Sequence, residues 1–472
     1  MTMSRPLASL AGAAASAAFL LANPAQAAPA APAPATSQAD DMAALKQQLN
    51  DLRRDYDARI QALEARLQAA EEHAANAPVA TAPPPAAPTE QAAAAPGEVI
   101  IADTGPEPVA KTASANAANP GVSVVLNGNY VAMAHNPAGA RISGYPLDGE
   151  AGLPKRGFSL DESEITLAAN VDPFLTANLT ASFSGDNEVS VEEAYIQSTA
   201  LPGGITLKAG RFFSAIGYLN ERHAHNWSFI DMPLPYRALL GVQYGDDGVQ
   251  ARWLAPTPFF LEVGGELFRG DHFPAGDQSK NKPGASTLFV HTGSDINDSS
   301  SWLGSLSYIR TQSHDRITDT DAGSDIFNGH SDLGIASLVY KWAPGGNPSE
   351  RNLTLSGEYF FGRERGDFNA VAINRDPRGW YAQGVYQFRK GWSAGVRYAE
   401  LRDLNAPLPL AGSVVDSLNH TPRAVSALIE FDTSEFGRFR AQYTHDNADP
   451  RSNDELLLQY TIVYGPHGAH RY

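Results

Sequence analysis

The chain contains no cysteine, so disulfide bonds and thiolate metal sites are both excluded. Positive charge is scarce: 35 Lys and Arg residues face 52 Asp and Glu, and a formal net charge of −17 argues against nucleic acid as a partner. After the N-terminus no run of about 18 apolar residues occurs, which excludes a helical membrane span in the mature chain. We identify no G-x-S-x-G elbow, no H-E-x-x-H signature and no phosphate-cradling glycine-rich loop, and we expect no enzyme activity.

The first 120 residues predict export followed by a helical spacer. Residues 1–27 have the order of a signal peptide, with Arg5, an Ala-rich apolar core and an A-x-A cleavage site; a short buried helix is the alternative. Residues 28–39 predict an Ala/Pro-rich linker. Residues 40–73 carry apolar residues at 3-4 spacing, which predicts a short α-helical coiled coil in the periplasm or, alternatively, a solitary amphipathic helix on a barrel rim. Residues 74–120 predict a disordered Ala/Pro-rich tether.

From residue 121 to residue 472, short alternating segments replace the helical pattern. Between residues 175 and 183, Leu, Ala and Phe alternate with Thr, Asn and Ser, so one face suits lipid and the other suits water. Sixteen such segments are separated, in turn, by tight turns and by long polar connections. The long connections span 135–157, 214–240, 270–285, 313–330 and 403–421.

This asymmetry predicts an all-β fold, a transmembrane antiparallel β-barrel of about 16 strands, with short periplasmic turns and long extracellular loops. A pair of soluble β domains is the alternative. Barrels of 16 to 18 strands leave an aqueous channel, whereas smaller ones are filled by side chains. We therefore expect an open lumen lined by the polar face of each strand.

Parity along the predicted strands separates lipid-facing from lumen-facing side chains. The predicted pore-lining charges are Arg252, Glu358, Arg397, Arg438 and Arg440. A wall of guanidinium groups would favour anions. The same arginines, paired with loop carboxylates, would instead stiffen the wall, and the sequence leaves both interpretations open.

The connection 214–240 concentrates histidine, charge and aromatic residues. By strand count it is the third extracellular loop, and we expect it to fold inward. The predicted constriction residues are Glu221, Arg222, His223, His225, Asp231 and Arg237. Since the two histidines share a face in an extended segment, they could bind zinc with nearby carboxylates, and no other cofactor is expected. For each residue, polar packing against the barrel wall is the alternative.

A second histidine pair, His467 and His470, lies close to the terminal Tyr472. Metal capture in the periplasm and interfacial packing in the last strand are both open. The two histidine pairs are predicted at opposite membrane faces, so they should not form one site.

Particular motifs resemble families of Gram-negative outer-membrane proteins. Residues 207–217, Leu-Lys-Ala-Gly-Arg-Phe-Phe-Ser-Ala-Ile-Gly, resemble the strand that enters the constriction loop in phosphate-selective porins. Those porins usually have Pro-Phe-Gly at the end of this run, so the resemblance implies no particular solute. The His-Ala-His run at 223–225, residues 244–250 and the Gly-Ala-His ending are similar to a group labelled zinc-regulated TonB-dependent outer-membrane receptors. This second resemblance implies metal-responsive expression, but residues 74–120 are too few for the folded plug of such receptors.

These features predict a porin-type channel in the outer membrane of a Gram-negative cell, with the N-terminal region in the periplasm. Small hydrophilic solutes or ions would diffuse through it passively, and the coiled coil points to a homotrimer. Two alternatives stay open: a zinc-linked uptake receptor driven by energy coupling, and a barrel enzyme or adhesin with a plugged pore.

Overall fold

The structure is a computed structural model that describes residues 119–137, 139–147, 151–185, 188–276, 281–320 and 323–465. All of them belong to one compact unit, Ala94–Tyr472. The predicted signal peptide, linker, coiled coil and tether lie outside the described residues, as do His467, His470 and Tyr472. Among the described residues, no helix is long and apolar enough to cross a membrane.

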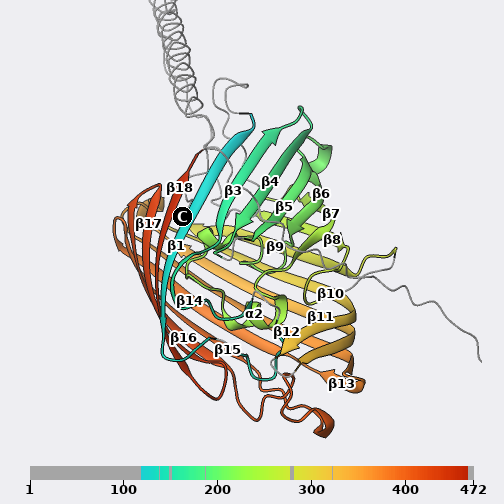
Figure 1. Ribbon diagram of the computed structural model, residues 1–472. Coiled ribbons are helices and arrows are strands. Elements are labelled where there is room, and N and C mark those ends of the chain that lie inside the picture. Colours follow the sequence, from blue (N-terminus) through green and yellow to red (C-terminus); the bar gives the residue numbers. More distant parts are fainter. Residues whose placement is uncertain are drawn as a thin grey trace, which may run out of the picture. The chain divides into compact units, whose positions relative to one another are not determined.

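The described part of the chain consists mainly of β-strands (Figure 1). The strands are β1 (Gly121–Met133), β2 (Gly157–Leu160), β3 (Ser163–Asn170), β4 (Leu175–Phe183), β5 (Val189–Ser198), β6 (Ile205–Phe213), β7 (Gly245–Leu254), β8 (Phe260–Phe268), β9 (Ala285–Asn297), β10 (Ser300–Thr320), β11 (Gly323–Trp342), β12 (Asn352–Phe368), β13 (Val371–Arg375), β14 (Arg378–Arg389), β15 (Trp392–Leu401), β16 (Arg423–Ser434), β17 (Gly437–Asn447) and β18 (Asn453–Tyr464). The helices are the α-helix α2 (Leu234–Leu240) and the short 3-10 helices η2 (Pro202–Gly204), η3 (Ala224–Asn226), η4 (Pro344–Gly346) and η5 (Leu408–Leu410).

These strands close into a single antiparallel barrel. Neighbouring strands of the wall follow one another along the chain, and β18 pairs with β1 over ten residue positions, which leaves the barrel no free edge (Figure 1). β2 and β3 both pair with β1, and β13 and β14 both pair with β12. When each of these pairs is counted as one wall position, the eighteen strands make sixteen, which confirms the predicted strand number and the all-β class.

Side chains alternate across the barrel wall as the sequence predicted. On β17 the relative exposure is 3% for Arg440 and 0% for Gln442, but 48% for Phe439 and 50% for Tyr443. The same alternation recurs along β7, β12 and β15. The wall is therefore apolar outside and polar inside.

Several element boundaries differ from the prediction. Residues 313–330 are mostly not a loop, because β10 and β11 continue beyond the neighbouring strands as a paired hairpin with a bulge between Ser313 and Arg316. Pairing satisfies the backbone groups that an irregular loop would leave to water. The connection predicted at 214–240 extends to residue 244, because α2 ends at Leu240 with Gly241 in the left-handed conformation and β7 begins only at Gly245.

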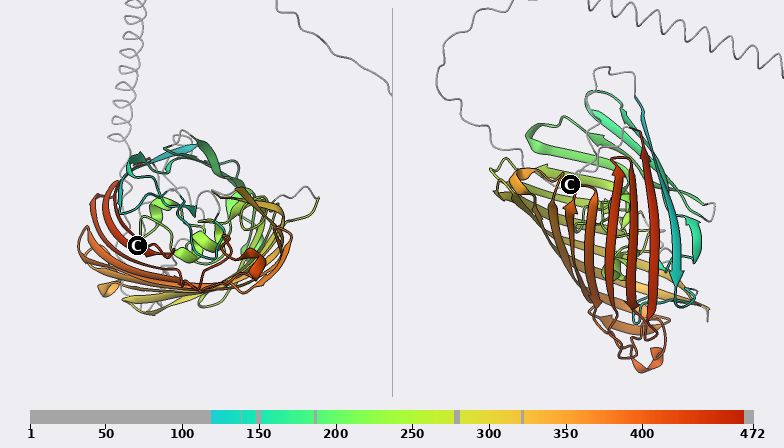
Figure 2. Two further views of the ribbon diagram at one scale, coloured as in Figure 1. Left: turned by 60° about the horizontal axis from the view of Figure 1, so that its bottom comes forward. Right: turned by 90° about the vertical axis from the view of Figure 1, so that its left-hand side faces the viewer.

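The connection between β6 and β7, residues 214–244, lies inside the ring of strands (Figure 2). We call it the inner loop; it contains η3 and α2. Its apolar side chains, among them Ile216, Met232 and Tyr236, form one buried cluster with inward side chains of the wall. The barrel interior is thus partly filled by the chain's own loop, and the candidate site lies where this loop meets the wall.

Candidate functional site

The base of the inner loop is closed by one buried side chain, Asn220. Its amide nitrogen donates to the carbonyl oxygens of Ser214 at 2.7 Å and Tyr244 at 2.8 Å, and its Oδ1 accepts from the Tyr244 N–H at 2.8 Å. The backbone of Ser214 and Tyr244 is also hydrogen-bonded directly, at 2.9 Å. The two ends of the loop are therefore held together before the chain crosses the lumen.

A buried carboxylate on β12, Glu358, holds the loop through neutral donors. Its Oε1 accepts from the Tyr218 N–H at 2.7 Å and its Oε2 accepts from the Tyr236 hydroxyl at 2.8 Å. Two wall hydroxyls, those of Ser337 and Tyr381, donate to the same carboxylate at 2.6 and 2.7 Å. Four donors around one buried carboxylate satisfy its lone pairs without a cation.

On β15 to β17, wall cations hold loop oxygen atoms. Arg397 donates to the Asp231 carbonyl at 2.6 Å and to its Oδ1 at 2.5 Å, and the guanidinium also lies 4.6 Å from the Phe229 ring. Arg440 donates to the Trp227 carbonyl at 2.6 Å, and Arg438 donates to the carbonyl of His225. The predicted pore-lining arginines of this sector therefore face inward and are bound to the loop.

Glu221 of the loop is surrounded by cations of β6 and β7. Arg252 forms an ion pair with it, and Nζ of Lys208 lies 3.9 Å from its Oε1. Arg252 also lies 3.5 Å from Glu262 on β8. The Arg252–Glu221 and Arg397–Asp231 pairs have the geometry expected if the arginines pair with loop carboxylates and stiffen the wall.

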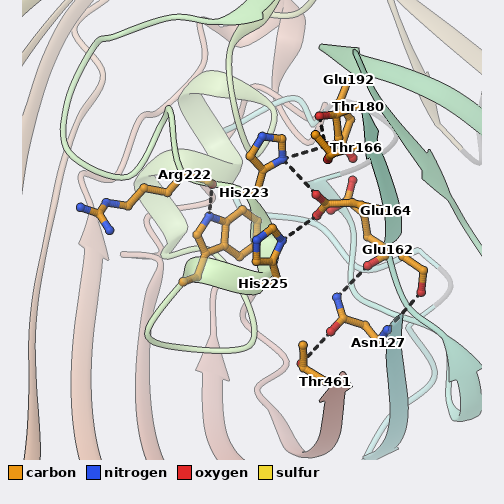
Figure 3. A network of polar contacts seen from close by, with 12 residues as sticks. Asn127, Glu162, Glu164, Thr166, Thr180, Glu192, Arg222, His223, His225 and Thr461 are labelled. Carbon is orange, nitrogen blue, oxygen red and sulfur yellow. Dashed lines mark hydrogen bonds and ion pairs between the residues drawn. The ribbon is translucent and has the colours of Figure 1, made fainter. Parts of the chain in front are cut away.

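On β3 and β5 the arrangement is reversed, because loop imidazoles meet wall carboxylates (Figure 3). Nδ1 of His223 lies 3.1 Å from Oε2 of Glu192 and 3.3 Å from Oε2 of Glu164. Nε2 of His223 lies 3.1 Å from Oε2 of Glu193. Nδ1 of His225 lies 3.0 Å from Oε1 of Glu164, and the two imidazole rings are stacked with centroids 5.8 Å apart.

A β-bulge explains why two consecutive glutamates reach the same histidine. In the β4–β5 pairing Thr180 faces Glu193, but the next residue, Ala181, faces Val191, so Glu192 is the extra residue. A bulge re-aims the side chain that strict alternation would send outward. The side chain of Glu192 is accordingly only 9% exposed. The sequence analysis missed Glu164, Glu192 and Glu193; parity could have found Glu164, but strict alternation sends only one of the consecutive Glu192 and Glu193 inward.

Two ionisable loop groups have shifted pKa values. Burial alone would lower the pKa of His223, but the three surrounding carboxylates raise that pKa well above its usual range. Burial alone would raise the pKa of Asp231, but Arg397 and the hydrogen bond from Gln442 hold it below its usual value. At neutral pH the inner loop is therefore positive where it meets β3 and β5 and negative where it meets β15.

The remaining predicted constriction residues also face the interior. Arg237, on α2, donates to the Ala151 carbonyl at 3.1 Å and lies 3.7 Å from Asp446. Arg222 lies over the Tyr218 ring at 4.3 Å. The structure thus places all six predicted constriction residues on one loop, distributed around the wall and not gathered at one point.

One sequence feature was overlooked. Residues 391–395, Gly-Trp-Ser-Ala-Gly, match the letters of the G-x-S-x-G motif. They form the β14–β15 turn and the start of β15, with Gly391 at φ +73°, and not the strand-to-helix elbow in which that motif presents a nucleophile.

A curated relative places the chain in a family. An uncharacterized protein of Aquifex aeolicus (strain VF5) is 31% identical over 337 residues, which cover 67% of this chain and 70% of that protein. The chain belongs to the same family as this Aquifex protein. No protein-family model matches the chain.

Solved structures similar to the chain are porins and other outer-membrane proteins. The anion-selective porin of Comamonas acidovorans has a TM-score of 0.48 at 8% identity, with 73% of this chain and 98% of that chain covered. OmpT of Vibrio cholerae, in its trimer form, has a TM-score of 0.46 at 8% identity, with the same coverage. OprB of Pseudomonas putida has a TM-score of 0.41 at 13% identity, with 73% and 94% covered. At these scores the likenesses assign no property to this chain.

Proposed function

We propose that the chain forms a porin-type channel in the outer membrane of a Gram-negative cell, through which small hydrophilic solutes or ions diffuse passively. One observation carries this proposal: a closed barrel, apolar outside and polar inside, has a long loop bound across its lumen. A closed barrel hides every backbone donor and acceptor from lipid. Sixteen strands give a ring wide enough to leave an aqueous path beside a folded loop.

The outer face of the wall supports the membrane location. Large apolar side chains lie exposed on strands all round the ring. They include Leu126, Val249, Leu288, Leu306, Leu338, Val396 and Phe439, which are between 48% and 65% exposed. Such a surface suits lipid and would be costly in water.

Aromatic residues gather toward both ends of the wall. Near the short turns, the rings of Trp392 and Phe431 lie 4.6 Å apart, and Phe439 stacks on its neighbour Tyr460. Toward the long-loop end, the rings of Trp380 and Tyr398 lie 5.2 Å apart. Two aromatic girdles flanking an apolar band are typical of barrels that span an outer membrane.

We further propose that the inner loop sets the narrowest part of the channel. Its six predicted constriction residues carry both signs of charge, and the arginines Arg252, Arg397, Arg438 and Arg440 are occupied by loop oxygen atoms or carboxylates. Ion selectivity would then depend on the net charge of the side chains where the inner loop meets the wall, and not on unpaired guanidinium groups along the wall. Homotrimer formation through the predicted coiled coil is part of the same proposal.

Planar-bilayer recording of the purified full-length protein tests this function. We expect steady single-channel conductance steps, and larger steps when the loop is loosened by Arg397→Ala. Arg310→Ala is the matched control, because the Arg310 side chain is 52% exposed and its contact to Asp332 is long, at 3.9 Å. A folded barrel that shows heat-dependent migration on gels but conducts no current would overturn the proposal. Light scattering of the same protein tests the trimer.

A further inference from the structure

The inner loop brings one histidine against carboxylates from two different strands of the wall. One ligand atom each of Glu164, Glu192 and His223 lies within 4.8 Å of the other two (Figure 3). Glu164 belongs to β3 and Glu192 to β5, whereas His223 belongs to the loop. We propose that these three side chains bind one divalent transition-metal ion, with zinc as the reference ion, which fastens the inner loop to β3 and β5.

The distances fit a single small ion. Zinc lies about 2.1 Å from nitrogen and oxygen ligands, so two ligands of a tetrahedral ion are about 3.4 Å apart. Nδ1 of His223 lies 3.1 Å from the Glu192 carboxylate and 3.3 Å from that of Glu164. The ligand oxygens of Glu164 and Glu192 lie within 4.8 Å of each other, so these side chains would close in on the ion as it binds. One imidazole and two carboxylates, in a chain without cysteine, suit the borderline ions of the first transition row.

The groups around these ligands are those that orient metal ligands in proteins. Nε2 of His223 is 3.1 Å from Glu193, and a ring N–H donated to a carboxylate leaves the Nδ1 lone pair directed at the ion. Oε1 of Glu164 accepts from Nδ1 of His225 at 3.0 Å, which fixes that carboxylate as well.

An unsatisfied oxygen points to a missing cation. Within the described residues, Oε1 of Glu192 is buried and has no hydrogen-bond partner. A fourth carboxyl, that of Glu162, interacts with Glu192 through a side-chain hydrogen bond as well as through its charge. Buried acceptors are normally satisfied, so this oxygen is available to a bound ion. The side chain of His223 is 19% exposed, which leaves the site a way in and a position for a water ligand.

Calorimetric titration of the purified full-length protein, freed of metal by a chelator, tests the site. With zinc chloride we expect one ion per chain. Glu193→Gln removes only an orienting group and should weaken zinc binding by roughly 10- to 100-fold. His223→Gln and Glu192→Gln each remove a ligand and should weaken it by more than that. The control is His445→Gln, because His445 is 50% exposed and lies 2.8 Å from Asp454, an exposed histidine–carboxylate pair with no third ligand among the described residues.

Three results would overturn the assignment: no saturable zinc binding, zinc binding that survives His223→Gln, or tighter binding of magnesium or calcium than of zinc. Since a variant could fail to fold, electron paramagnetic resonance of the wild-type protein loaded with Cu²⁺ gives an independent readout. We expect coupling to imidazole nitrogen, and its absence would also count against the site.

One consequence rests on the proposed channel function. If the ion fastens the inner loop, zinc should steady or reduce the single-channel current of the wild type and leave that of His223→Gln unchanged. Conductance without zinc tests the channel, whereas calorimetry in detergent tests the site. The two proposals can therefore fail separately.

Discussion

The inner loop is held in two sectors of the barrel wall by opposite arrangements of charge. On β15 to β17 the wall supplies guanidinium groups and the loop supplies Asp231 and backbone carbonyls. On β3 and β5 the wall supplies carboxylates and the loop supplies His223 and His225. Arginine keeps its charge at any physiological pH, whereas imidazole can lose its proton or exchange it for a metal. One side is thus a permanent fastening and the other can be changed by a ligand.

Removing the arginine contact between β15 and the inner loop should have the largest effect on stability. Arg397→Ala removes the cation that contacts Asp231; breaking a fully buried pair costs about 3–5 kcal/mol, and because the Asp231 side chain is 25% exposed the loss should lie toward the lower end. We expect that loss in the free energy of unfolding measured by urea titration in detergent micelles. Arg310→Ala, at an exposed pair, should cost about 0–1 kcal/mol. Equal losses in the two variants would mean that the Arg397 contact does not hold the loop.

Removing the histidine contact between the inner loop and the carboxylates of β3 and β5 should have the next largest effect on stability. His223→Gln, measured with a chelator present, takes the positive charge away from three wall carboxylates and should cost about 2–3 kcal/mol. Adding Glu192→Gln removes one of the repelling charges and should restore part of the loss. If the double variant is less stable than His223→Gln by the full amount that Glu192→Gln costs on its own, the two groups are not coupled.

Substitutions of Glu358 test whether charge or hydrogen bonding contributes more to holding the inner loop, because the hydrogen-bond partners of Glu358 are neutral donors. Glu358→Ala leaves buried hydroxyl and N–H groups unsatisfied and should cost about 1–3 kcal/mol. Glu358→Gln keeps one acceptor and the side-chain volume, so its cost should be smaller. If the two substitutions were equally costly, the negative charge itself would be required, contrary to this interpretation.

Acid should weaken the Asp231 fastening, and this effect should be the smallest. The pKa of Asp231 is lowered in the folded protein, so its contribution is complete above the ordinary aspartate pKa of about 3.9 and is lost as the pH falls through the lowered value. The stability difference between wild type and Asp231→Asn, followed by urea titration across pH, should stay constant from neutral pH to about pH 5. A difference that disappears between pH 7 and pH 6 would assign the effect to another group.

Much of the fold could be predicted because a barrel wall is a local pattern. Alternation in a single strand, such as Phe439, Arg440, Ala441 and Gln442, states which side chain faces the lumen, and this holds for Arg252, Glu358 and Arg397 as well. The extent of the β10–β11 hairpin could not be predicted, because residues 313–330 are polar and only pairing with each other makes them strands.

The site was half predictable for a related reason. The density of charge and histidine between residues 214 and 240 identifies an unusual loop, but nothing local states what each side chain meets. The bulge at Glu192 changes the parity by one residue, so alternation alone does not predict that both Glu192 and Glu193 face inward.

The sequence by itself determined the barrel, its strand number, the inward faces of its strands and the loop that carries the histidines, because each is encoded by residues adjacent along the chain. Only the tertiary structure decided that the arginines are bound by the loop and that His223 meets Glu164, Glu192 and Glu193. Those contacts join residues about 30 to 210 positions apart, and their partners are set by barrel closure, strand register and a bulge. Long-range geometry of that kind has no local signature, so it emerges only when the wall has closed around the loop.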